Sequence, residues 1–130
     1  MLRVVLDTNV VVSALLSPNG NPAKILDLVT DKKLNIYYSS EILSEYIDVL
    51  NRPHFNFNDK NRSDFIQNIQ KFGILVTPPL SDIPLPDEDD RCFYDIANFY
   101  EAILVTGNMK HYPVKSFIVT PTEFLLFVNT

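Results

Sequence analysis

The sequence predicts a single α/β domain over residues 1–130, folded as a three-layer α/β/α sandwich with a mainly parallel central sheet. Short aliphatic runs, typical of strands buried on both faces, alternate with segments in which apolar residues recur at helical spacing. The chain has 130 residues, of which 46% are hydrophobic, and this suits one hydrophobic core. Strands that alternate with helices in a chain this short favour a parallel sheet between two helical layers.

The clearest strand opens the chain, from Leu2 to Leu6, and runs directly into the polar triplet Asp7-Thr8-Asn9. We expect Asp7 to stand where this strand becomes a loop, before apolar character resumes from Val10 to Leu16. Three further elements are predicted in this half: a helix from Ala23 to about Asp31, a strand from Leu34 to Tyr38, and a helix from Glu41 to about Leu50 that Ser39 and Ser40 can cap.

The second half is more polar and its elements are shorter. Residues 56–61 indicate a polar turn, and residues 77–86 a proline-rich surface connection. Gly73 is a natural end for the helix that precedes it. The predicted elements are a helix from Ser63 to Phe72, a strand from Ile74 to Val76, a helix from near Asp87, strands from Ala102 to Thr106 and Ser116 to Val119, and a helix from Glu123 to Val128 begun by Thr120 and Pro121.

Composition excludes several classes of protein. The net charge of −5 argues against a broad basic surface for nucleic acid, which leaves a local or metal-mediated contact. The single cysteine, Cys92, excludes an intramolecular disulfide and a zinc cluster built on thiolates. No apolar run reaches the roughly 20 residues of a membrane span, and the first residues lead into a strand rather than a signal peptide. We therefore expect a soluble, cytoplasmic protein with no membrane partner.

Two buried-looking strands end in polar residues, Asp7-Thr8-Asn9 and Thr106-Gly107-Asn108. In an open parallel sheet, ligands bind outside the carboxyl ends of the central strands. A carboxylate that ends an apolar strand loses hydration that a surface acid would keep, so a functional role is favoured for Asp7. The helices predicted to begin near Ser40 and Asp87 start at the same edge and can bring further acids to it.

Helical geometry selects among those acids. On the helix that begins near Ser40, Glu45 lies at the border of the apolar face, where it can point along the sheet edge. On the helix after Asp87, Asp90 flanks the apolar face and Asp95 lies on the far side. Asp87 itself can be the N-cap, since carboxylates are favoured in a first helical turn.

A cluster of Asp7, Glu45 and Asp90 would be mutually repulsive without a cation, and hard oxygen ligands of this kind suit Mg²⁺ or Mn²⁺. The chemistry that follows is metal-assisted hydrolysis of a phosphodiester bond. No histidine falls in the helical or strand positions of this cluster, which disfavours a zinc hydrolase. We expect His54 and His111 to be isolated loop residues.

Four motifs, in order along the chain, resemble those of a known family. They are VVLDTNVVVS from Val4 to Ser13, SEILSEY from Ser40 to Tyr46, DEDDRCFYDIA from Asp87 to Ala97, and VTGN from Val105 to Asn108. They look like the successive motifs of PIN-domain ribonucleases, especially the bacterial VapC-like branch of toxins in toxin-antitoxin systems. Residues 119–125 also resemble that branch, so the match covers nearly the whole chain.

The resemblance implies roles for individual residues. Asn108 takes the place of an acid that the family often has after its Thr-Gly pair, and it offers an oxygen without a charge. A one-metal site or weaker metal affinity follows. Asp95 is a reserve candidate for the missing charge, and Asp87 a second one as a cap or outer acid. The implied metal ligands are Asp7, Glu45, Asp90 and Asn108, with Thr8, Asn9 and Thr106 as polar neighbours.

Beyond the site, the resemblance implies single-stranded or structured RNA as substrate, a small antitoxin protein as inhibitor, and a homodimer. Three residues that follow Asn108 prompt a separate hypothesis because they are close to it in sequence. Lys110, His111 and Lys115 could contact RNA phosphate beside the metal.

Two other functions stay open. A phosphatase of the haloacid dehalogenase type also begins with a strand and an aspartate, but it normally needs a second aspartate two places on, where this chain has Asn9. A PIN-like scaffold would bind RNA or a partner protein without cleaving it. Asn108 and the acidic composition support that alternative.

Overall fold

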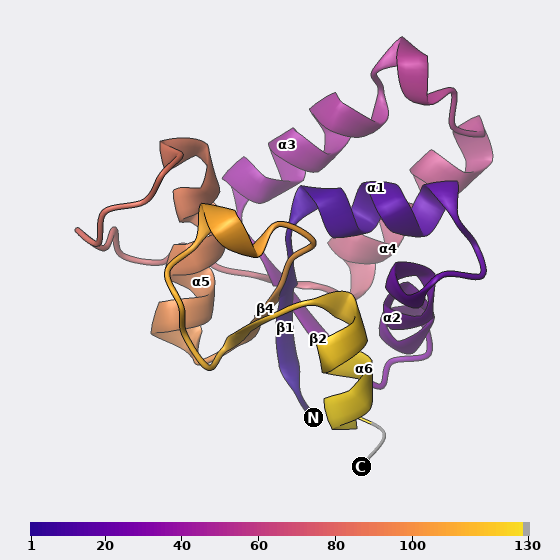
Figure 1. The fold of residues 1–130 in the computed structure, drawn as a ribbon. Helices are drawn as coiled ribbons and strands as arrows, with labels where there is room; N and C mark the ends of the chain where they lie inside the picture. Colours follow the sequence, from indigo (N-terminus) through magenta and orange to yellow (C-terminus); the bar gives the residue numbers. More distant parts are fainter. Residues whose placement is uncertain (129–130) are drawn as a thin grey trace.

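The computed structural model describes residues 1–128, and its centre is a five-stranded sheet in which all neighbouring strands are parallel. The strand order is β3-β2-β1-β4-β5, so the first strand lies in the middle (Figure 1). The strands are β1 (Arg3–Leu6), β2 (Asn35–Tyr38), β3 (Ile74–Leu75), β4 (Ile103–Val105) and β5 (Ile118–Val119). The parallel α/β architecture predicted from the sequence is confirmed.

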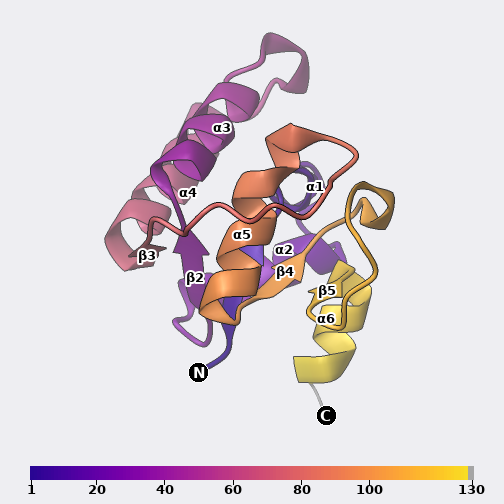
Figure 2. The ribbon, with the colours of Figure 1, turned by 90° about the vertical axis from the view of Figure 1, so that its left-hand side faces the viewer.

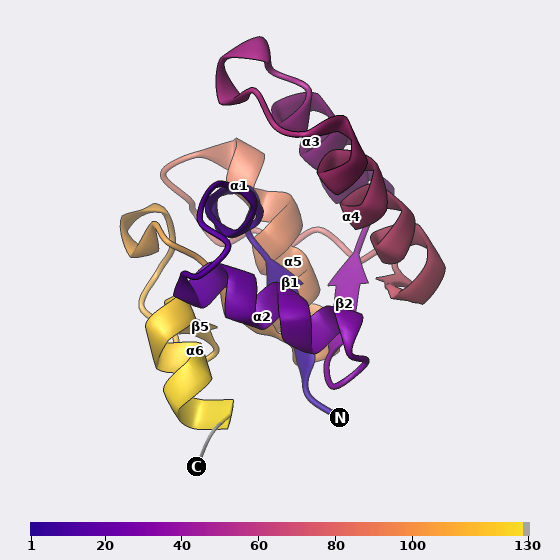
Figure 3. The same ribbon diagram turned by 90° about the vertical axis from the view of Figure 1, so that its right-hand side faces the viewer.

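Helices cover both faces of this sheet. Figure 3 shows α2, α4 and α6 in front of the strands, and Figure 2, from the opposite side, shows α5 in front. α5 packs against β1, β2 and β4, while α2 packs against α1 and α6. The helices are α1 (Thr8–Leu16), α2 (Asn21–Thr30), α3 (Ser40–Leu50), α4 (Asp59–Phe72), α5 (Arg91–Tyr100) and α6 (Pro121–Val128), and the 3₁₀ turns are η1 (Pro53–Phe55), η2 (Glu88–Asp90) and η3 (Met109–His111).

The core holds the carboxyl end of β1 between α3 and α5. Leu6 at the end of β1 is fully buried, as are Tyr46 of α3 and Phe93 of α5, whose ring centroids lie 6.4 Å apart. The Tyr46 hydroxyl donates to the carbonyl oxygen of Leu6. Asp7 follows Leu6 and Glu45 precedes Tyr46 in the chain. Apolar packing and this buried hydrogen bond therefore place two of the predicted acids.

The expectation that Asp7 stands where a strand becomes a loop is wrong. Val10 donates its backbone N–H to the Asp7 carbonyl at 3.0 Å, so Asp7 is the N-cap residue of α1. Thr8 and Asn9 therefore lie in the first turn of a helix that continues through the apolar run to Leu16. Strand and helix are joined with no loop between them, which fixes the direction of the Asp7 side chain.

Other helices also begin earlier or later than predicted, among them α2, which begins at Asn21 rather than Ala23. α4 begins at Asp59 because Asn58 Oδ1 accepts from the backbone N–H groups of Lys60 and Asn61 at 2.8 and 3.4 Å, so the predicted polar turn ends sooner. The helix expected from Asp87 is first the 3₁₀ turn η2 and becomes α-helical at Arg91. α6 begins at Pro121, ahead of the expected start at Glu123.

The start of α6 is fixed by a reciprocal pair of hydrogen bonds. Glu123 donates its N–H to Thr120 Oγ1 at 3.2 Å, and Glu123 Oε1 accepts from the Thr120 N–H at 2.9 Å. This is the capping-box arrangement that the sequence Thr-x-x-Glu favours. Among residues 1–128, no helix combines the length and the apolar character needed to cross a bilayer.

Candidate active site

Asp7 follows β1 directly, and only 5% of its surface is exposed. Two hydroxyl groups donate to its Oδ2 atom: Thr106, which follows β4, at 2.8 Å, and Tyr112 at 2.9 Å. In the sheet, β2 and β3 lie on one side of β1, and β4 and β5 lie on the other. Asp7 is therefore at the point where the strand order changes direction, the usual place for a ligand in an open parallel sheet.

Glu45 reaches the same edge from α3. It is half-buried, whereas Glu41 and Asp48 on the same helix are exposed, in agreement with a border position on the helix. The Thr8 hydroxyl donates to Glu45 Oε2. Burial raises the pKa of Glu45, the bond from Thr8 lowers it, and the nearby charge of Asp7 raises it further. The two carboxylates are therefore close enough to repel each other.

Asp90 is the last residue of η2 and the N-cap residue of α5. Its side chain is 15% exposed, and its Oδ2 lies 3.0 Å from Nδ1 of His111. Burial, followed by the charge of Asp7, raises the pKa of Asp90 to about 6, while His111 works in the opposite direction. Asp7 thus lies between two other acids, one from α3 and one from the start of α5.

The expectation that His111 is an isolated loop residue is wrong. Its Nδ1 contacts Asp90, and its Nε2 lies 3.0 Å from Nδ2 of Asn108. Both contacts can form at once when Nδ1 carries a proton that it donates to Asp90 and Nε2 accepts from the Asn108 amide. His54, by contrast, is exposed and stacks beside Phe55.

The polar neighbours predicted for the site join the ends of β1 and β4. Asn9 Oδ1 accepts from the backbone N–H of Gly107 at 2.8 Å, and the backbone N–H of Asn108 donates to Thr106 Oγ1 at 3.0 Å. A Cβ on Gly107 would lie 3.2 Å from Asn9 Oδ1, so a larger residue would crowd this contact. Asn108 is held beside the acids by these bonds.

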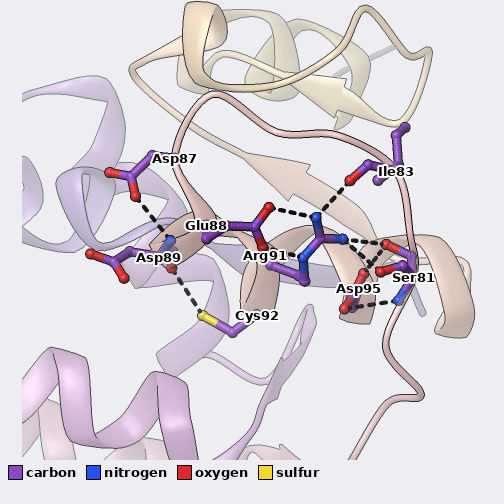
Figure 4. A network of polar contacts seen from close by, with 8 residues as sticks. All are labelled: Ser81, Ile83, Asp87, Glu88, Asp89, Arg91, Cys92 and Asp95. Atoms are coloured by element: carbon purple, nitrogen blue, oxygen red, sulfur yellow. Dashed lines mark hydrogen bonds and ion pairs between the residues drawn. The ribbon is translucent and has the colours of Figure 1, made fainter.

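The two reserve acids have other partners (Figure 4). Asp87 accepts from the backbone N–H of Asp89 at 2.9 Å, and so caps η2. Asp95 is 2% exposed, and its two oxygens accept from the hydroxyl and the backbone N–H of Ser81 at 2.6 and 3.3 Å. Asp95 therefore secures the connection from residue 77 to residue 86 against α5, and the structure does not bring it to the other acids.

Lys110 and Lys115 are both exposed but occupy different parts of the chain. Lys110 lies in η3, two residues after Asn108. Lys115 lies three residues before β5, and its carbonyl accepts from the N–H of Ile118 at 3.1 Å. Because β5 is parallel to β4, the chain has to return toward the opposite edge before β5 begins. Lys110 is the better placed of the two for a contact at the acids.

The donors at this edge suit a hard divalent cation in their chemistry. The described contacts use one oxygen of each acid, Oδ2 of Asp7, Oε2 of Glu45 and Oδ2 of Asp90, and the second oxygen of each has no hydrogen-bond partner among residues 1–128. Within those residues, no three histidine, cysteine, aspartate or glutamate side chains are close enough to hold a metal ion as they stand. At least one of the three acids would have to turn to join the others at a shared ion.

Sequence reasoning missed Tyr112 and the contacts of His111. Both residues lie in or beside the short turn η3, where no hydrophobic periodicity shows which way a side chain points. The available signal was their position directly after the polar triplet that ends β4.

Comparison with known proteins agrees with this architecture. A solved structure of PAE2754 from Pyrobaculum aerophilum is 13% identical and superposes with a TM-score of 0.63 over 98% of this chain and 90% of its own. A structure of VapBC2 from Rickettsia felis bound to a DNA fragment from their promoter is 18% identical, with a TM-score of 0.56 over 91% of this chain and 97% of its own. At these identities the likeness shows the fold.

Sequence comparison carries the family assignment. An uncharacterized protein of Methanocaldococcus jannaschii, MJ1680, is 34% identical over 110 residues, which are 82% of this chain and 71% of that protein. The family model described as PIN domain matches residues 3–110, a range that includes all four of the motifs and the acids Asp7, Glu45 and Asp90. The chain therefore belongs to the PIN domain family.

Proposed function

We propose that this protein is a metal-dependent endoribonuclease that hydrolyses RNA phosphodiester bonds, with Asp7, Glu45 and Asp90 as the acids that bind Mg²⁺ or Mn²⁺. PIN domains are generally nucleases. The observation that carries the proposal is that Glu45 and Asp90, from two other elements, lie near enough to Asp7 at the switch point of the sheet for its charge to act on them. The charge of Asp7 raises the pKa of both of the others, which is the arrangement that a cation would stabilise.

The residues of the site have separate proposed roles. A bound divalent cation would supply an activated hydroxide and offset the negative charge that develops on the phosphate. Thr8 orients Glu45 and Thr106 orients Asp7 through neutral hydroxyl donors, so one oxygen of each acid is held. Asn108 offers an uncharged amide oxygen beside them, so the site has three negative charges and we propose that it holds one ion.

Of the three predicted phosphate contacts, Lys110 and Lys115 are proposed to bind RNA phosphate, whereas the ring nitrogens of His111 contact Asp90 and Asn108. Lys110 has the strongest support because it is exposed in the turn next to Asn108. The proposed biological setting is a toxin-antitoxin pair, with a small antitoxin protein as inhibitor and a homodimer of this chain. The shared fold with VapBC2 and the motifs of the VapC-like branch support this setting.

Cleavage of RNA in the presence of Mn²⁺ tests the proposal. We expect the native protein to cleave, and Asp7→Asn to lower the rate by at least about 100-fold, because it removes the central charge while keeping the hydrogen-bond acceptor for Thr106 and Tyr112. Asp64→Asn, an exposed carboxylate on α4, is the matched control. A crystal soaked with Mn²⁺ is the structural counterpart: an ion that leaves any one of the three acids unbound would contradict the proposed ligand set.

A second candidate is a PIN-like scaffold that binds RNA or a partner protein without cleaving it. It is favoured by the absence, within residues 1–128, of three acids in coordination distance and by Asn108 in place of an acid. The same assay separates the two. RNA that is bound but not cleaved by either the native protein or Asp7→Asn would support the scaffold.

A further inference from the structure

One short turn contacts two of the proposed metal ligands at once. His111 is the last residue of η3 and Tyr112 is the next residue. The Nδ1 atom of His111 lies 3.0 Å from Asp90 Oδ2, and the Tyr112 hydroxyl donates to Asp7 Oδ2 at 2.9 Å. Asp7 follows β1 and Asp90 begins α5, so neighbouring residues of a single turn hold acids that come from distant parts of the chain.

The turn is itself firmly held. The backbone N–H of His111 donates to the Asn108 carbonyl at 3.1 Å, and that of Tyr112 donates to the Met109 carbonyl at 3.2 Å. Tyr112 is 5% exposed and belongs to the hydrophobic core, so the turn cannot move without exposing its ring. Asn108 occupies the second ring nitrogen of His111, which fixes the plane of the imidazole. Both donors therefore come from a rigid support.

Both contacts end on one oxygen of the acid and leave the other without a described partner. A hydrogen bond to one oxygen of a carboxylate restricts the directions in which the other oxygen can point. His111 can donate through Nδ1 to Asp90, and Tyr112 donates through its hydroxyl to Asp7. The pair is thus suited to orienting two acids toward a shared ion.

We propose that His111 and Tyr112 are positioning residues that orient Asp90 and Asp7 for a divalent cation. This inference rests on the proposed function, since it concerns the affinity of the same site for its metal. In this inference, His111 acts at the metal site through Asp90. Its position in the sequence, close to Asn108, had suggested only a contact with phosphate. Partners of this kind contribute about 10- to 100-fold to metal affinity in other proteins.

Calorimetric titration of the metal-free protein with Mn²⁺, without RNA, tests the proposal. We expect His111→Ala to weaken Mn²⁺ binding by about 10- to 100-fold, and Tyr112→Phe to weaken it about 10-fold. His111→Gln should recover part of the loss, because its amide nitrogen can still donate to Asp90. His54→Ala removes an exposed histidine from η1 and should bind Mn²⁺ like the native protein.

RNA affinity in EDTA separates a positioning role from a phosphate contact. We expect His111→Ala to keep the RNA affinity of the native protein within about twofold. Unchanged Mn²⁺ binding together with lost RNA binding would overturn the inference and assign His111 to the phosphate. The His111 side chain is 43% exposed, so its variants should fold even if Tyr112→Phe does not.

The proposed function and this inference fail in different ways. If the native protein does not bind Mn²⁺, or if Asp7→Asn binds it equally well, both the proposed function and the inference are overturned. Native binding that is lost in Asp7→Asn but retained in His111→Ala and Tyr112→Phe overturns only the inference. Thermal unfolding of each variant establishes that a lost titration signal comes from a folded protein.

Discussion

Burial and the charge of Asp7 favour the uncharged forms of Glu45 and Asp90. Burial and the charge of Asp7 raise the pKa of Asp90 to about 6, well above the ordinary value for aspartate. Because the folded value lies above the unfolded one, the contribution of Asp90 to stability is present below about pH 4 and is lost as the pH rises through about 6. At neutral pH the fold therefore holds a charge that it disfavours.

Asp90→Asn should make the metal-free protein more stable at neutral pH. Asparagine keeps an oxygen to accept from His111 but removes the disfavoured charge. We expect a gain on the order of 1 kcal/mol at pH 7.5, after allowance for solvent screening, that shrinks toward zero near pH 4. Urea unfolding in EDTA at both pH values measures it, and Asp64→Asn on the surface of α4 is the control. An equal gain at both pH values would contradict this explanation.

Tyr46 provides a second test at the scale of one residue. Its ring is fully buried beside Glu45, and its hydroxyl donates to the Leu6 carbonyl, one residue before Asp7. Tyr46→Phe should lower the free energy of unfolding by about 1–3 kcal/mol, because a buried carbonyl loses its partner. Tyr94→Phe is the matched control, since that ring is also buried and its hydroxyl has no described hydrogen bond within residues 1–128. If the two substitutions lowered stability equally, the lost hydrogen bond would not be the cause.

At the scale of elements, Arg91 joins the connection from residue 77 to residue 86 to the start of α5. Its guanidinium group donates to the Ser81 carbonyl and hydroxyl at 2.8 and 2.9 Å, to the Ile83 carbonyl at 2.6 Å, and to both oxygens of Glu88 (Figure 4). Ser81 is also bound by Asp95. The connection leads directly into η2, so this network helps to place Asp90.

Arg91→Met should release that connection. We expect the variant to be less stable than the native protein, because several hydrogen bonds to one charged group disappear together. Leu80 is 86% exposed, so cleavage after it by chymotrypsin should become faster in the variant. Arg52→Met, which removes an exposed pair with Asp48, should change stability by less than about 1 kcal/mol. Proteolysis at the native rate would show that the network does not restrain the connection.

The same scale shows how far the sequence could predict the site. Asp7, Glu45 and Asp90 could be chosen as candidates because each stands at or beside a strand or helix whose apolar period is visible in the sequence. Helix starts were less accurate where a side chain decided them, as with Asn58 before α4. His111, Tyr112 and Ser81 belong to turns and connections, where contacts depend on how distant segments pack, so their partners could not be predicted from local pattern.

At the scale of the whole molecule, the net charge of −5 constrains the proposed binding of RNA. An acidic protein repels a phosphate backbone at long range, so binding depends on a few local cations and on a metal ion. Among the residues close to the acids, Lys110 is exposed in η3. Lys32 and Lys33 lie just before β2, at the opposite edge of the sheet.

Charge reversal tests whether RNA contacts are local to the site or spread over the surface. One double variant carries Lys110→Glu and Lys115→Glu, and the other carries Lys32→Glu and Lys33→Glu. They have the same net charge and differ only in where the charge is changed. For single-stranded RNA, the logarithm of affinity falls with the logarithm of salt concentration by about 0.7 for each phosphate contact. We expect the first variant to lose about 0.7 from this slope for each contacting lysine, and the second to keep the native slope. Because Lys115 lies where the chain returns to β5, Lys110→Glu alone should account for most of the change. Equal losses in both double variants, measured in EDTA, would mean that net charge rather than a local contact governs RNA binding.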